Sequence, residues 1–222
     1  MKKYLAIVVY SLIIGLTAAT QPFINEIRQF RTADSLQAPP QHPILFIGSS
    51  SFTYWRDVQA YFPGRTIVNR AFGGSSLTHL IQYADEVIFR YQPKQIVIYC
   101  GENDLAGDDK VTADTVLFRF SKLVSIIHAK RPGTPIIYLS MKPSPSRRKY
   151  LSAIQEGNKK IKMFLSSVPN ATYLDVYSAM LTDNGNIRGD IFTADSLHMN
   201  KKGYALWQPL LEPLLHQGTI EQ

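Results

Sequence analysis

The stretch ILFIGSSSFTYW, Ile44 to Trp55, joins a short apolar run to three consecutive serines. An apolar run that ends at a glycine is typical of a strand buried on both faces of a parallel sheet. A serine directly after such a strand is usually a helix N-cap, and it also stands where a nucleophile would stand. The stretch therefore predicts a strand-to-helix turn and poses the question of which serine, if any, reacts.

Four more apolar runs follow the first one and read as strands: residues 66–72, 95–101, 135–141 and 171–177. Amphipathic stretches with helical spacing lie between and after them: residues 77–93, 112–133, 147–169 and 200–217. Strands that alternate with helices in this way form a parallel sheet with helices on both faces. The sequence therefore predicts an α/β domain, a three-layer α/β/α sandwich around a five-stranded parallel sheet.

The composition narrows the class of protein. A chain of 222 residues with 45% apolar residues suits one globular domain and does not suit disorder. The formal charge of +7 favours anionic partners, but no basic stripe interleaved with aromatic residues is present, so nucleic acid is not an expected partner. The single cysteine, Cys100, cannot form an internal disulfide or a zinc cluster, and its place in an apolar strand predicts a small buried hydrophobe.

The N-terminus has the pattern of a secretory signal peptide. Residues 1–19 contain two lysines, an apolar core from Leu5 to Leu16, and small residues that suit cleavage after Ala19. The apolar core is shorter than the roughly 20 residues of a membrane span, so an uncleaved membrane anchor is the second interpretation. Either one predicts an extracytoplasmic domain, periplasmic or secreted. Residues 20–42, with their proline-rich end, predict a tether that could contain a short helix, and residues 43–222 predict the domain.

Polar loops follow the first three predicted strands, and one more precedes the last helix: Gly48–Ser51, Asn69–Ser76, Gly101–Asp109 and Asp195–Asn200. Carboxyl ends of parallel strands share one edge of the sheet, so these loops are expected to meet there. Together they hold a hydroxyl, a glycine-rich backbone, an amide, a carboxylate and an imidazole. These groups are the parts that acyl transfer requires.

Each loop also has a simpler interpretation. The glycine-rich loop could cradle a phosphate, but it lacks the lysine of a P-loop and the spacing of a dinucleotide fingerprint. A metal could bind Asp104, Asp108 and Asp109, but the EF-hand spacing is absent and a solvated acidic loop is the simpler reading. The spacing of Asp195 and His198 is more telling, because it lets the carboxylate hold one ring nitrogen and leaves the other for a serine.

The order of these blocks resembles the SGNH hydrolase family, the GDSL-like lipases and esterases, from about Ile44 to the last helix. The four residues that give the family its name occur here in order: Ser50 in Gly48-Ser49-Ser50, Gly74, Asn103 in Gly101-Glu102-Asn103-Asp104, and His198 in Asp195-Ser196-Leu197-His198. The first block is not the Gly-x-Ser-x-Gly elbow of α/β-hydrolases, because Phe52 stands in place of the second glycine.

Two positions depart from the commonest family pattern. Ser49 replaces an aspartate and Glu102 replaces a glycine. Both resemble an esterase subgroup whose first block reads Gly-Ser-Ser-Ser with a nearby tryptophan, here Trp55. They weaken assignment to the lysophospholipase and thioesterase branch.

The resemblance implies a flavodoxin-like SGNH hydrolase fold and a catalytic triad of Ser50, His198 and Asp195. It also implies an oxyanion hole formed by the backbone N–H groups of Ser50 and Gly74 and the side-chain amide of Asn103. Neither a metal nor an organic cofactor is required.

The expected activity is that of a serine esterase for short-chain esters, acetyl esters in particular, on a small-molecule or glycan substrate. No long apolar lid insertion is visible between the blocks, which favours a shallow site. The basic run Arg147-Arg148-Lys149 could favour an anionic sugar or lipid headgroup, although a solvated loop is the simpler interpretation. Two alternatives stay open: a lysophospholipase or thioesterase with the same triad, and a non-hydrolytic module that transfers acyl groups or binds glycans.

Overall fold

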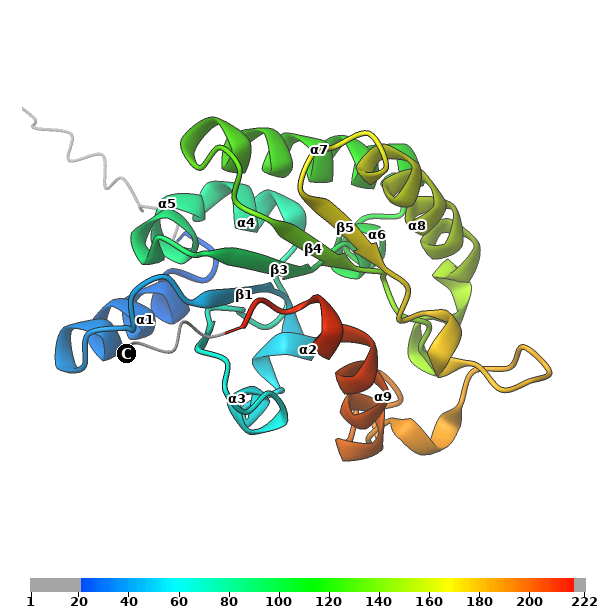
Figure 1. The fold of residues 1–222 in the computed structure, drawn as a ribbon. Coiled ribbons are helices and arrows are strands. Elements are labelled where there is room, and N and C mark those ends of the chain that lie inside the picture. Colours follow the sequence, from blue (N-terminus) through cyan, green and yellow to red (C-terminus); the bar gives the residue numbers. More distant parts are fainter. Residues whose placement is uncertain (1–20, 218–222) are drawn as a thin grey trace, which may run out of the picture.

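The five apolar runs form the strands of one parallel sheet in the computed structural model, which describes residues 21–217 (Figure 1). The spatial order is β2-β1-β3-β4-β5, and every neighbouring pair is parallel. The strands are β1 (Ile44–Gly48), β2 (Ile67–Asn69), β3 (Gln95–Tyr99), β4 (Ile136–Leu139) and β5 (Ala171–Leu174). The predicted three-layer α/β/α fold is confirmed.

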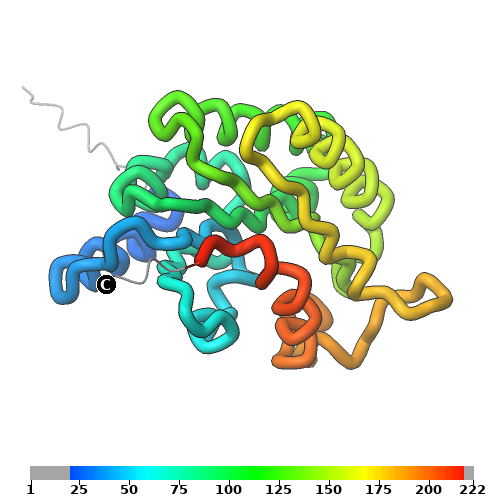
Figure 2. Tube along the Cα trace, viewed as in Figure 1, coloured from blue at the N-terminus to red at the C-terminus, as the bar shows by residue number. Residues whose placement is uncertain are grey.

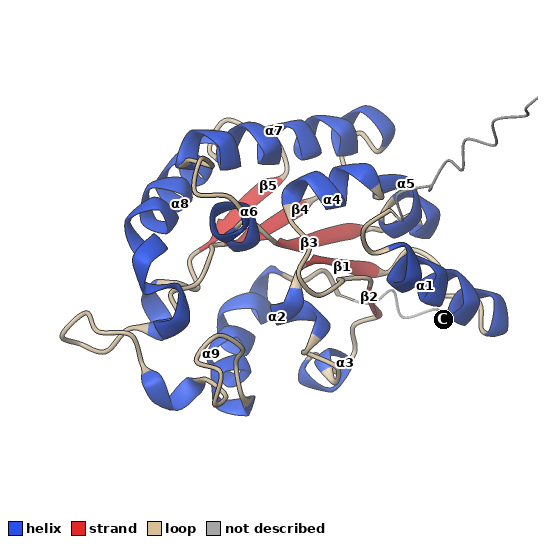
Figure 3. Ribbon diagram, turned by 180° about the vertical axis from the view of Figure 1, so that it is seen from behind, coloured by secondary structure: helices blue, strands red, loops and turns tan. Residues whose placement is uncertain are grey.

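Helices cover both faces of the sheet, as Figures 1 and 3 show. One core lies beneath α1 (Ile24–Leu36), α4 (Leu77–Gln82), α5 (Ala84–Val87), α7 (Ala113–Lys130) and α8 (Leu151–Leu165). The other lies beneath α2 (Ser50–Thr53), α3 (Val58–Tyr61) and α9 (Lys201–Leu211). The short helix α6 (Glu102–Gly107) follows β3. Alternate residues of β1 serve the two cores, with Leu45 and Ile47 in the first and Ile44 and Phe46 in the second.

The turn after β1 depends on Gly48. Its φ of +143° is one that other residues rarely adopt, and a Cβ there would lie 2.0 Å from the carbonyl oxygen of Tyr99. The next residue, Ser49, donates its N–H to that same carbonyl at 3.0 Å. The chain therefore leaves the sheet at once and begins α2 at Ser50.

Packing on the second face brings the two ends of the domain together. Figure 2 shows the C-terminal helix α9 beside the segment that follows β1, although they are far apart in sequence. The rings of Trp55 and Tyr204 stack with centroids 4.9 Å apart, and the Tyr204 hydroxyl donates to the Ser51 carbonyl at 2.8 Å. This contact holds the start of α2, at Ser50, close to the segment just before α9, which contains His198.

The segment expected as a tether contains helix α1, which packs on the domain. Ile27 is buried in the first core, and the buried carboxylate of Asp34 accepts hydrogen bonds from Arg70 and from the Tyr91 hydroxyl, with Arg90 3.3 Å away. A buried carboxylate is tolerated where such partners surround it. Residues 24–36 therefore form the short helix that the sequence allows within the tether. The sequence did not reveal that this helix packs on the domain, because its partners lie far along the chain.

Two further details differ from the sequence-based expectations. The single helix expected over residues 77–93 is broken into α4, α5 and a 3₁₀ turn at Phe89–Tyr91, because Tyr83 and Ile88 leave the helical region with ψ of 20° and φ of −122°. Strand β5 is only partly buried, which suits its place at the edge of the sheet.

The predicted signal peptide or anchor, residues 1–19, lies outside the described residues. Within the part of the chain that the structure describes, no helix is both long enough and apolar enough to cross a bilayer. Cys100 is buried and free of any disulfide, as its apolar surroundings predict.

Candidate active site

Ser50 is the serine whose hydroxyl meets the predicted base. It is the first residue of α2, directly beyond the carboxyl end of β1, and its side chain is partly exposed. Its Oγ lies 3.0 Å from Nε2 of His198. Its neighbours Ser49 and Ser51 are buried. The structure thus brings together the nucleophile and base that the sequence predicts, across nearly the whole domain.

A tight loop holds Asp195 against His198. Oδ2 of Asp195 lies 2.6 Å from Nδ1 of His198, and Oδ1 accepts the backbone N–H groups of Leu197 and His198 at 2.9 Å each. The Thr193 hydroxyl donates to the same oxygen at 2.7 Å. These donors, the His198 backbone N–H first among them, hold the pKa of Asp195 well below its usual range.

The ionised state of Asp195 fixes the tautomer of His198. A carboxylate only accepts hydrogen bonds, so Nδ1 of His198 carries the hydrogen that it donates to Asp195. Nε2 is then the acceptor, and it faces the Ser50 hydroxyl. The imidazole is therefore oriented to take a proton from Ser50, as in a serine esterase triad.

Asn200 anchors the other end of this loop. As the N-cap of α9, its side chain accepts the N–H groups of Lys202 and Gly203, and its amide donates to the carbonyls of Asp190 and Phe192 at 2.9 and 3.0 Å. The two residues between His198 and α9 therefore have little freedom. An asparagine directly before a helical pattern is the sequence signal for this cap.

The glycine-rich loop lies against the nucleophile. A Cβ on Gly73 would be 3.9 Å from the Ser50 Cβ, and Gly74 adopts a φ of +83°. The Ser75 hydroxyl donates to the Gly48 carbonyl at 2.9 Å and ties this loop to the end of β1. Among residues 21–217, the backbone N–H groups of Ser50 and Gly74 have no protein acceptor, which leaves them available to an oxyanion.

Asn103 completes the set of predicted oxyanion donors. It lies in α6, just beyond β3, and its Nδ2 donates one hydrogen to the Ser75 carbonyl at 2.9 Å. An amide nitrogen carries two hydrogens, so one remains for a substrate. The contact with Ser75 joins Asn103 to the loop that contains Gly74.

A buried ion pair supports the residue before Asn103. The ammonium of Lys142 lies 3.1 Å from a Glu102 oxygen, and their side chains are only 2% and 8% exposed. The Tyr99 hydroxyl donates to the other Glu102 oxygen. Burial, followed by the Glu102 charge, raises the pKa of Tyr99 and keeps this donor protonated. Sequence reasoning noted Glu102 only as a departure from the family pattern and missed Lys142, whose one signal is its place directly after an apolar strand.

The acidic residues after Asn103 have separate structural partners. Asp104 accepts the Leu77 N–H at 2.9 Å and pairs with Arg119 at 2.8 Å, whereas Asp109 pairs with Lys149. Within the described residues, no group of three His, Cys, Asp or Glu side chains could hold a metal ion. The metal-binding interpretation of this loop therefore has no support from the geometry.

Two further side chains border the site. The ring of Tyr54 packs edge-on against His198 with centroids 4.6 Å apart, and 49% of Tyr54 is exposed. Nη2 of Arg147 lies 3.4 Å from Oδ1 of Asn103. Sequence reasoning included Arg147 in a basic run and did not single out Tyr54, whose contact with His198 depends on tertiary structure.

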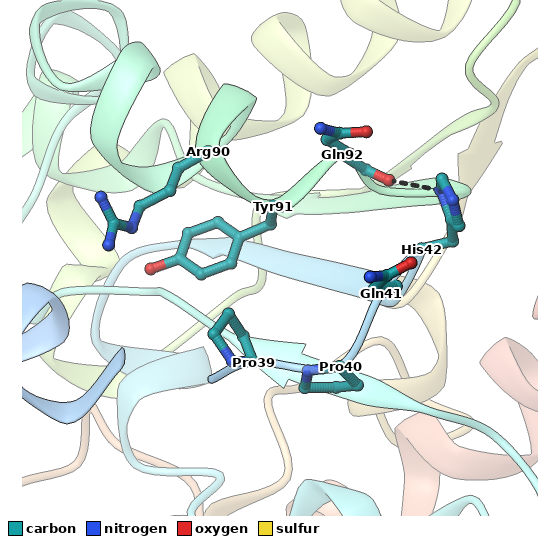
Figure 4. Close-up of a pocket in the computed structure, with 7 residues that line it drawn as sticks. All are labelled: Pro39, Pro40, Gln41, His42, Arg90, Tyr91 and Gln92. Carbon is teal, nitrogen blue, oxygen red and sulfur yellow. Dashed lines mark hydrogen bonds between the residues drawn. The ribbon is translucent and has the colours of Figure 1, made fainter. Parts of the chain in front are cut away.

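A separate hollow of about 190 Å³ lies at the opposite edge of the sheet (Figure 4). It is lined by Pro39, Pro40, Gln41, His42, Arg90, Tyr91 and Gln92. These residues precede β1 and β3, so they lie at the amino ends of the strands. The hollow is therefore not part of the site that contains Ser50.

Several solved structures of other proteins share the fold of this chain. A structure from Streptococcus pneumonia whose name refers to platelet activating factor is 23% identical, with a TM-score of 0.74 over 86% of this chain and 92% of that one. A GDSL-like lipase from Bacteroides thetaiotaomicron is 20% identical, with a TM-score of 0.72 over 85% and 96% of the two chains. A catalytic mutant of an acetylxylan esterase from Geobacillus stearothermophilus is 14% identical, with a TM-score of 0.64 over 84% and 100%. At these identities the likeness shows a shared fold.

No protein of curated function matches the chain. The model of the GDSL-like lipase/acylhydrolase family matches residues 34–206, which is most of the sequence and includes every residue of the proposed triad and oxyanion hole. The chain therefore belongs to the GDSL-like lipase/acylhydrolase family, a membership that implies hydrolase activity.

Proposed function

We propose that this protein is a serine esterase that cleaves short-chain esters, acetyl esters in particular, on carbohydrate. The observation that carries the proposal is the chain of hydrogen-bond distances from Ser50 to His198 and on to Asp195, 3.0 and 2.6 Å. Such a chain activates a serine hydroxyl that is otherwise a weak nucleophile.

In the proposed mechanism, Ser50 Oγ attacks the ester carbonyl while His198 Nε2 takes the hydroxyl proton. The carbonyl oxygen becomes an oxyanion that accepts the N–H groups of Ser50, Gly74 and Asn103. Collapse of this intermediate breaks the bond to the leaving alcohol, which receives the proton from His198. Water then attacks the acyl-enzyme with His198 as the base, releasing the carboxylic acid and free Ser50. Asp195 holds the imidazole and stabilises its protonated form throughout.

The exposure of the triad supports an ester substrate that joins a small acyl group to a large alcohol. The His198 side chain is 22% exposed and that of Asp195 is 49% exposed, so the triad lies near the surface. The exposed Tyr54 ring beside His198 offers a flat surface of the kind on which a sugar ring can lie. The acetylxylan esterase among the structural neighbours makes an acetylated glycan a reasonable first substrate to test.

The N-terminal pattern of two lysines, an apolar core and small residues supports an extracytoplasmic location, secreted or tethered to a membrane. Esters on an extracellular or envelope glycan would be accessible there. Cell fractionation of the full chain, compared with a variant in which the apolar core carries two aspartates, tests this location. A signal in the cytoplasmic fraction of the unaltered chain would contradict it.

The activity is tested by comparing p-nitrophenyl acetate, octanoate and palmitate, each with wild type and with Ser50→Ala. We expect acetate to be the best substrate and its turnover to vanish in Ser50→Ala. Preference for octanoate or palmitate would favour the lysophospholipase or thioesterase alternative. No turnover of any ester by the folded protein, or an active Ser50→Ala, would refute the proposal and favour a glycan-binding module. Addition of a sugar acceptor separates hydrolysis from acyl transfer, because only transfer yields a new sugar ester.

A further inference from the structure

The side chain of Arg147 contacts the amide of Asn103, a residue of the proposed oxyanion hole. Its Nη2 lies 3.4 Å from Oδ1 of Asn103, the amide whose nitrogen is the proposed oxyanion donor. One amide group therefore separates the guanidinium from the position of the reacting carbonyl. Arg147 itself is partly buried, whereas the next residue, Arg148, is exposed.

The loop that carries Arg147 is held against the catalytic loop. The backbone N–H of Ser146 donates to the Ser196 carbonyl at 3.1 Å, and the N–H of Arg147 donates to the Ser144 carbonyl at 3.1 Å. Pro143 and Pro145 restrict the backbone before it. The guanidinium is therefore presented to the site by a backbone with few alternatives.

The positive charge of Arg147 has no carboxylate partner within residues 21–217. Four acidic residues of the surrounding loops pair with other groups: Glu102 with Lys142, Asp104 with Arg119, Asp109 with Lys149, and Asp195 with His198. A fifth, Asp108, accepts the backbone N–H of Lys110 and forms no ion pair with Arg147. The Nε of Arg147 is also buried without an acceptor. A partly desolvated guanidinium that lacks an anionic partner is an uncommon arrangement and is relieved by binding an anion.

We propose that Arg147 binds the carboxylate of the substrate, and that the natural substrate is an acetyl ester of an acidic sugar. This inference rests on the proposed esterase function and names its substrate class. A carboxylate suits a guanidinium because its two oxygens accept a pair of parallel N–H donors, with one charge on each side. The short separation of Arg147 from the oxyanion hole lets one sugar residue present its acetyl group to Ser50 and its carboxylate to Arg147.

The test uses two probes of nearly the same shape. The first is the methyl glycoside of tri-O-acetyl-glucuronic acid, which carries a free carboxylate, and the second is its uncharged glucuronamide. Acetate release is measured with each for wild type, Arg147→Gln, Arg147→Lys and Arg148→Gln. We expect wild type to favour the acid in kcat/KM by roughly 10- to 100-fold, the usual effect of a hydrogen bond to a charged group. Arg147→Gln should bring the ratio of acid to amide close to one, and Arg147→Lys should retain part of the preference. Arg148→Gln removes the same charge from the exposed neighbouring position and should leave the ratio unchanged.

The outcomes separate this inference from the esterase proposal. A ratio near one in wild type, with acetate released from both probes, overturns the inference alone. Equal losses on both probes in Arg147→Gln also overturn it, because they would mean that Arg147 only positions Asn103. If Arg148→Gln lowers the acid-to-amide ratio as much as Arg147→Gln does, the preference comes from the overall positive charge of the surface, and the inference is overturned. No acetate release from either probe by the folded enzyme overturns the esterase proposal together with the inference.

Discussion

Replacement of Lys142 by methionine should destabilise the protein strongly, because it leaves the Glu102 carboxylate buried without its ionic partner. The two side chains are 2% and 8% exposed and lie 3.1 Å apart, so water cannot replace the missing charge. Removal of one member of a buried ion pair typically costs about 3–5 kcal/mol. For a domain of this size that corresponds to a fall in Tm of roughly 6–20 °C.

The double variant Glu102→Gln, Lys142→Met should recover most of this loss. A buried pair replaced by uncharged side chains of similar volume is often neutral in stability, because the desolvation penalty of both charges disappears. The Tyr99 hydroxyl retains an acceptor in the glutamine oxygen, so the hydrogen bond beneath Asn103 survives. Urea unfolding of wild type, both single variants and the double variant measures the coupling free energy between the two residues.

The matched control is Lys149→Met. Lys149 and Asp109 form an ion pair at 3.3 Å, nearly the same separation, but both side chains are exposed. Surface pairs contribute little, so this variant should unfold at the wild-type urea concentration. Equal losses from Lys142→Met and Lys149→Met, or additive losses in the double variant, would refute the reasoning that burial makes the Glu102–Lys142 pair important.

Four further predictions concern the turn after β1 and the site. Gly48→Ala should lower the free energy of unfolding in urea by more than about 4 kcal/mol, because its Cβ would lie 2.0 Å from the Tyr99 carbonyl oxygen. The control Gly64→Ala, with φ of +76° and open space around it, should lower it by only about 1–2 kcal/mol. Similar losses in the two variants would contradict this account of the turn. Asn103→Ala should fold and lose about 10²–10³ in kcat on p-nitrophenyl acetate, and near-full turnover would exclude it from the oxyanion hole. Asp195→Asn should lose about 10⁴ in kcat because the histidine tautomer is no longer fixed. The pKa of Asp195 is lowered on folding, so its contribution to stability is present above about pH 4 and is lost as the pH falls through the folded-state pKa. The difference in unfolding free energy between wild type and Asp195→Asn should therefore shrink as the solution is acidified. A difference that grows in acid would contradict this role of Asp195.

Local patterns in the sequence predicted the sheet well. The run from Ile44 to Gly48 is a buried interior strand, and Cys100 lies in the core beyond the end of β3. These predictions succeed because a strand covered on both faces must be apolar throughout, which is a property of neighbouring residues. The pattern over residues 77–93 predicted one helix and was wrong in that respect, since apolar spacing alone did not reveal the breaks at Tyr83 and Ile88.

The resemblance to the SGNH hydrolases, carried by the order of four motif blocks, predicted a triad of Ser50, Asp195 and His198. The structure places these three side chains within hydrogen-bond distance of one another in series. Other features depend on contacts between distant segments. Asp34 is buried only because Arg70 and Tyr91 surround it, and Glu102 is held only because Lys142 reaches it from the loop after β4.

The sequence by itself thus determined the positions of the strands, because these follow from local apolar patterning. It also determined the family and the chemical groups of the site, through the identity and order of the motif residues. Only the tertiary structure decided that Tyr54 lies against His198 and that Arg147, unlike its neighbour Arg148, is directed at Asn103. The physical reason is that side-chain direction depends on the backbone path of each loop and on what packs against it. Those constraints come from residues more than 40 positions away, such as Ser196, whose carbonyl holds the loop of Arg147 in place.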